Sequence, residues 1–177
     1  IQRYILERLY TFAWPEAKPA ADCIDAVLAS PCDDLIDAMD RILSLHRLQG
    51  HPALLKAAKV IERTHNILKG GTLRQRDVDP ARLQEPIEQR LWDVFRVHSD
   101  RVTSLVNARS YGEATTVFGE AFFEPLHEFF ERVLVNAPDE ALQQNRLALM
   151  NTIHTLYTDR VADLSKLTVL QREEPSA

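Results

Sequence analysis

The chain has 177 residues, 45% of them hydrophobic and 27% charged, which predicts a folded core and excludes a disordered or collagen-like chain. This length fits one sizeable domain or two small ones, and no stretch approaches the roughly 18 apolar residues of a membrane span. The net charge of −5, taken as a sum, argues against a nucleic-acid partner.

Apolar residues recur at intervals of three and four along nearly the whole chain, which predicts helices rather than strands. Asp33 or Asp34 can cap one helix, and His51-Pro52 can open the next, which should stop at Gly70-Gly71. In this first part we expect helices over about 1–12, 19–30, 33–49 and 51–69.

Residues 70–80 (GGTLRQRDVDP) form the most convincing loop, and a short turn follows from Pro80. Pro86 fits the first turn of a long helix, a helix from Tyr111 should be kinked or split at Pro125, and Asp139 should cap the last long helix. The tail from Arg172 should fray.

These segments predict an all-α, antiparallel helical bundle of about seven helices, forming a single domain over 1–177.

Since the sequence opens at Ile1 inside a periodic pattern, without a leader peptide, we expect it to be a piece of a longer protein. Two cysteines, Cys23 and Cys32, form neither a disulfide framework nor a metal knuckle, and we expect inert thiols in a reducing compartment.

One short basic segment interrupts the acidic chain. Residues 56–76 hold six Lys or Arg and one acidic residue, whereas acidic residues outnumber basic ones on either side. On a helical wheel, one face of 51–69 is apolar, and Lys56, Lys59, Arg63 and Asn66 gather on the opposite side. Cations and an amide so arranged suit phosphate oxygens and base edges, although a solvated face that keeps the protein soluble gives the same pattern.

Four segments resemble the β subunit of bacterial-type glycyl-tRNA synthetases. The segment KVIERTHNILKG (59–70) is similar to the family signature KRIxNILKK, with Val60 at its second basic position and Lys69-Gly70 at its closing lysine pair. VDPARLQEP (78–86), EFFERVLVNAPD (128–139) and NRLALMNTIHTLYTDRVADLSKL (145–167) follow the family pattern in the same order.

The resemblance implies the helical, DALR-like anticodon-binding domain at the C-terminus of that subunit. The implied parent is a cytoplasmic (or, in a fused plant-type enzyme, organellar) ligase that joins glycine to its tRNA using ATP. Its catalytic site, with ATP and Mg²⁺, lies in the α subunit or α region, so the implied partners are tRNA-Gly and the remainder of the synthetase. We therefore expect no catalytic residue, cofactor or metal in this chain, and neither a membrane nor DNA as partner.

The predicted tRNA-binding residues combine the basic segment with the family motifs. We expect cations to hold phosphates and Asn66 to bond a base, since the bases of a single-stranded anticodon loop can be read along their Watson–Crick edges. Arg146 could equally tie the last helix to its neighbour. The predicted set is Lys56, Lys59, Arg63, Asn66, Lys69, Arg74, Arg76, Asn145 and Arg146.

Two other classes of function fit parts of the sequence. Helical E-x-x-H pairs at Glu62/His65 and Glu124/His127 are a feature of di-metal bundles, but no partner glutamates are evident. The serious alternative is a helical domain that packs against the rest of the same enzyme without touching tRNA, which should expose apolar rather than basic patches.

Overall fold

The computed structural model describes residues 8–10, 14 and 18–168, and this part of the chain is helical, without strands. The all-α prediction is confirmed. The described residues form six α-helices rather than about seven, because the first predicted helix falls mostly outside them and its described part, Arg8–Tyr10, is a 3-10 turn (η1). The α-helices are α2 (Ala21–Leu28), α3 (Leu35–Arg47), α4 (Pro52–Gly70), α5 (Pro86–Asn107), α6 (Tyr111–Arg132) and α7 (Glu140–Thr158).

The helices begin where local capping chemistry dictates. The Asp34 carboxylate accepts the backbone N–H of Ile36 at 2.8 Å before α3, and the Asp139 carboxylate accepts that of Leu142 at 3.0 Å before α7. Pro52 and Pro86 occupy the first turns of α4 and α5, where their missing N–H groups cost nothing. These predicted starts are confirmed.

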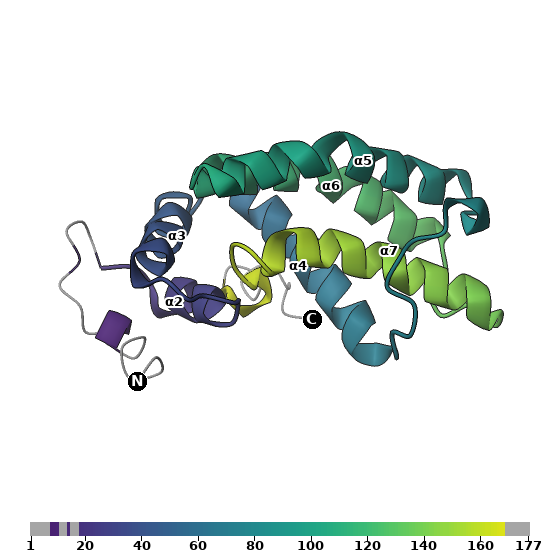
Figure 1. Ribbon diagram of the computed structural model, residues 1–177, viewed down its shortest axis with the longest axis horizontal. Helices are drawn as coiled ribbons and strands as arrows, with labels where there is room; N and C mark the ends of the chain where they lie inside the picture. The colour runs from purple at the N-terminus through teal and green to yellow at the C-terminus, as the bar shows by residue number, and fades with distance from the viewer. Residues whose placement is uncertain (1–7, 11–13, 15–17, 169–177) are drawn as a thin grey trace, which may run out of the picture.

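Helices α5 and α6 form a hairpin along one long side of the molecule, and α4 crosses α7 beneath it (Figure 1). Helix α4 packs against α6, α7 and the 3-10 turn η3 (Leu164–Lys166), while α2 and α3 pack together at one end. Buried apolar residues from all six α-helices join one hydrophobic cluster. Within the described part of the chain, no helix is long and apolar enough to cross a membrane.

Of the kink or split predicted at Pro125, the structure excludes the split. The helix runs unbroken from Tyr111 to Arg132 with Pro125 buried inside it. A proline inside a helix costs about 3 kcal/mol through its lost donor and its steric clash. Burial of the aromatic rings around it offsets that cost, and the fully buried rings are Phe118, Phe122 and Phe129.

The crossing of α4 and α6 depends on a glycine. A Cβ atom at Gly119 would lie 2.6 Å from the carbonyl oxygen of Ala53 and 2.9 Å from the backbone nitrogen of Ala57. Both are backbone atoms, so a rotamer change cannot relieve the contact. Only glycine therefore allows α6 to approach α4 this closely.

We expect Gly119→Ala to lower the free energy of unfolding by about 1–3 kcal/mol, because the two helices must separate. Gly112→Ala is the matched control: it lies in the same helix with open space around its Cβ, and should raise stability by about 0.5–1 kcal/mol. Urea denaturation of both variants measures the difference. Equal stabilities would contradict the close crossing.

Candidate nucleic-acid interface

The apolar face of α4 is wider than its sequence predicts. Ala57, Ala58 and Ile61 are buried as expected, but Val60 and Thr64 are buried as well. Helix α7 covers this additional side, where the Thr64 hydroxyl lies 3.0 Å from Nδ1 of His154. Burial lowers the pKa of His154, so this imidazole is neutral at physiological pH.

The first half of the basic face turns toward α6. Lys56 Nζ forms an ion pair with Glu120 at 2.7 Å. The Arg63 guanidinium donates to Nδ1 of His127 at 2.9 Å and lies 5.9 Å from the ring centroid of Phe130. Lys59 is half-buried and also has an interaction partner. Thus part of the negative charge that balances this basic face comes from another helix.

The contact with Arg63 assigns the tautomer of His127. A guanidinium only donates hydrogen bonds, so Nδ1 of His127 is the acceptor and Nε2 carries the proton. That Nε2 lies 3.2 Å from a carboxylate oxygen of Glu131, to which it can donate. Arg63 is therefore exposed, yet held on the surface of α6.

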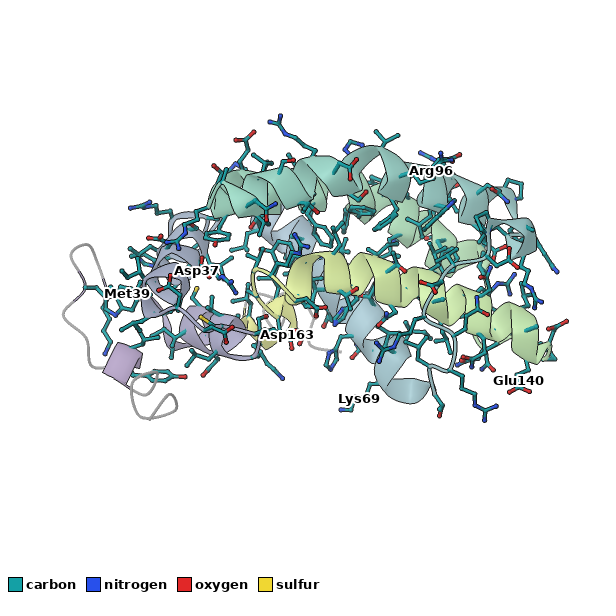
Figure 2. The ribbon with its side chains drawn as sticks, viewed as in Figure 1. Asp37, Met39, Lys69, Arg96, Glu140 and Asp163 are labelled. Carbon is teal, nitrogen blue, oxygen red and sulfur yellow. The ribbon has the colours of Figure 1, made fainter. Side chains whose placement is uncertain are left out.

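The C-terminal end of α4 and the loop after it carry the accessible cations. Asn66, Lys69 and Arg76 are exposed, and within the described residues none of them has a hydrogen-bond or ion-pair partner. Figure 2 shows Lys69 near this end of α4, away from Arg96 on α5. Arg74 pairs with Glu140, at the start of α7, and both side chains are more than two-thirds exposed. Such exposed pairs contribute little to stability and can exchange partners.

Side chains of α7 hold the loop in place. The amide oxygen of Gln144 accepts the backbone N–H of Arg74 at 2.7 Å, and its amide nitrogen donates to the carbonyl of Thr72 at 2.9 Å. The Asn145 side chain forms two hydrogen bonds with the backbone of Asp79, at 2.7 and 3.0 Å. These bonds give an otherwise irregular segment a defined position.

Arg146 forms a buried ion pair. Its Nε donates to Glu88 at 2.6 Å, and its Nη1 donates to the carbonyl oxygen of Leu134 at 2.9 Å. The second oxygen of Glu88 accepts the backbone N–H groups of Gln84 and Glu85, both at 2.7 Å, which completes the capping box of α5. Every charge in this network is thus satisfied internally.

The two predicted contacts on α7 therefore need correction. Asn145 and Arg146 are buried, and their polar groups bind the protein's own backbone and Glu88. Asn145 holds the backbone of Asp79 at the end of the loop that carries Arg74 and Arg76, whereas Arg146 ties α7 to Glu88 of α5 and to the carbonyl oxygen of Leu134. Residues 145–150 of α7 are all buried, because neighbouring segments surround the helix over this range.

A polar hollow of about 350 Å³ lies beside this loop. It is bounded by the Gly70-Gly71 turn on one side and the beginning of α7 on the other, and Arg74 and Glu140 line it. The sequence gives no signal for Glu140 as a partner of this site, because 66 residues separate it from Arg74.

Other candidate chemistry finds no matching geometry in the described residues. No group of three or more His, Cys, Asp or Glu side chains there could hold a metal ion, so the two E-x-x-H pairs are not assembled into a site. Burial raises the pKa of the Cys23 thiol to about 12, and burial also raises that of Cys32. Both thiols are therefore weak nucleophiles at neutral pH.

Comparison with known proteins gives a consistent set of relatives, although no family model matches the chain. The glycine–tRNA ligase beta subunit of Dichelobacter nodosus is 32% identical over 170 residues, covering 96% of this chain and 24% of that protein. The beta subunit of Anaeromyxobacter dehalogenans (strain 2CP-C) is 36% identical over 166 residues, covering 93% and 23%. That of Desulforudis audaxviator is 32% identical over 143 residues, covering 81% and 20%.

These relatives are all beta subunits of an aminoacyl-tRNA synthetase, a class of ligases, and the described part of this chain is helical. Over most of its length, the chain is thus similar to the beta subunits of glycine–tRNA ligases, as its motifs predicted. It spans only about a fifth to a quarter of the length of the relatives it matches.

We expect Arg146→Ala to lower the free energy of unfolding by about 3–5 kcal/mol, because it leaves the Glu88 carboxylate buried without its guanidinium. Arg132→Ala is the control, since Arg132 is exposed and its partner Glu128 also pairs with Arg90, so its loss should cost less than about 1 kcal/mol. Chemical denaturation followed by circular dichroism measures both. A similar small loss in both variants would contradict the structural role of Arg146.

Proposed function

We propose that the chain is the anticodon-binding part of a glycine–tRNA ligase beta subunit. It would hold tRNA-Gly while the α subunit, or α region, glycylates the tRNA using ATP and Mg²⁺. The similarity to beta subunits supports the enzymatic context. The accessible basic end of α4 supports the RNA contact.

One observation carries the proposal. In a protein of net charge −5, the cations Lys69, Arg74 and Arg76 are exposed together at one helix end and its loop. RNA phosphates displace counterions from such a group and bind there, whereas the acidic remainder repels RNA in other orientations. Asn66, one turn before Lys69, adds an amide that can bond a base edge.

The basic face therefore divides into two parts with different roles. Lys56 and Arg63 contact α6, so an RNA phosphate would have to compete with Glu120 and His127 for them. Lys69 and Arg76 have no such competitors among the described residues. We expect the phosphate contacts to concentrate at the end of α4.

A second function, docking against the rest of the synthetase, is supported by an exposed apolar patch on α5. Val97 of α5 is 70% exposed and lines a largely apolar hollow of about 590 Å³ together with Val94. This patch lies on a different helix from the basic end. Both functions can therefore operate in one molecule.

The double variant Lys69→Ala/Arg76→Ala should weaken binding of tRNA-Gly about 10-fold or more at physiological salt, because two phosphate contacts are lost. The slope of log K against log salt should also fall by about two. Fluorescence anisotropy with labelled tRNA over a salt series measures both quantities.

Lys18→Ala/Arg96→Ala is the matched control, because it removes one exposed Lys and one exposed Arg elsewhere. Its affinity and salt slope should stay close to those of the parent chain. Equal losses in the two double variants would show that only net charge matters and would refute a localised site. A parent chain that does not bind tRNA would favour the docking function.

A further inference from the structure

We propose that Arg74 and Glu140 together read a cytosine of the anticodon. This inference rests on the proposed function, and it names the residues that would give that site its base specificity. All glycine anticodons carry cytosine at their last two positions, so a cytosine reader would suit every tRNA-Gly.

The pair stands where a splayed base can reach it. Arg74 and Glu140 line the polar hollow between the Gly70-Gly71 turn and α7, with side chains 69% and 68% exposed. Its volume of about 350 Å³ is at the lower end of the range for small-ligand sites. Pro138 at its edge offers a flat apolar surface for the face of a base.

The pair keeps unused hydrogen-bonding groups. Nη1 of Arg74 donates to Oε1 of Glu140. Within the described residues, no other side chain or backbone group bonds the second carboxylate oxygen or the remaining guanidinium nitrogens. A base edge can therefore bond to the pair without breaking it.

The order of these groups matches cytosine better than uracil. Cytosine presents an amino donor at N4 and acceptors at N3 and O2, and a carboxylate beside a guanidinium presents an acceptor followed by donors. Uracil presents an acceptor at O4 and a donor at N3. In the same register against this pair, uracil would place two acceptors together and two donors together. Shifted by one position, its N3–H and O2 can bond to the pair, but it then forms two hydrogen bonds where cytosine can form three.

The protein holds the reader in a defined position. Gln144 fixes the backbone of Arg74, and Asp139 caps the helix turn that carries Glu140. Lys69 lies directly before the Gly70-Gly71 turn and Arg76 lies two residues after Arg74, so the neighbouring cations can hold the phosphates on either side of the base.

The test measures a ratio of affinities rather than one affinity. An RNA hairpin with the tRNA-Gly anticodon stem and loop is compared with hairpins in which each of the two cytosines is replaced by uracil. The 177-residue chain should prefer the cytosine hairpin by about 10-fold or more at one of the positions. Glu140→Gln should lose most of that preference, because its amide can turn either a donor or an acceptor toward the base.

Glu113→Gln is the matched control, since Glu113 forms a similarly exposed ion pair with Arg101 elsewhere on the surface, at 2.6 Å. Each variant removes one negative charge, so general electrostatics would strengthen binding to every hairpin and leave the ratios unchanged. A cytosine preference that survives Glu140→Gln overturns the inference but leaves the proposed function intact. A chain that binds none of the hairpins, or no tRNA, overturns the proposed function itself.

Discussion

The buried ion pair between Glu88 and Arg146 determines how the second half of the molecule is arranged. Its carboxylate closes the first turn of α5, while its guanidinium extends from α7 to the carbonyl oxygen of Leu134 in the segment after α6. Two buried charges are stable only with complete hydrogen bonding, so each of these three segments must keep its position relative to the others. This requirement explains why a polar pair lies inside an otherwise apolar cluster.

The two residues before Arg146 on α7 extend this arrangement to the surface. Gln144 and Asn145 bind the backbone of the connection between α4 and α5 at Thr72, Arg74 and Asp79. Leu73 and Val78 of this loop pack against the core, and these hydrogen bonds hold its polar remainder. Residues of α7 thus decide where the basic loop lies.

Two basic side chains of α4 have their partners on a neighbouring helix rather than on α4 itself. Lys56 and Arg63 find their partners on α6, at Glu120 and His127. The end of α4 extends beyond this contact, and its cations remain accessible there. The basic face of α4 therefore contacts α6 along its first part and is accessible at its C-terminal end. That division concentrates the attraction for polyanions on a small part of an acidic protein.

The sequence by itself determined the helical class and most helix boundaries, because both depend on local chemistry. Residue spacing, the caps at Asp34 and Asp139 and the prolines at 52 and 86 act within one or two turns. It also indicated the family and the basic segment. Only the tertiary structure decided that α6 continues through Pro125, that Arg146 is internal and that Glu140 lies beside Arg74. Each of these depends on contacts between residues that lie far apart in the chain. A local sequence pattern does not show how such residues pack or which charges they neutralise.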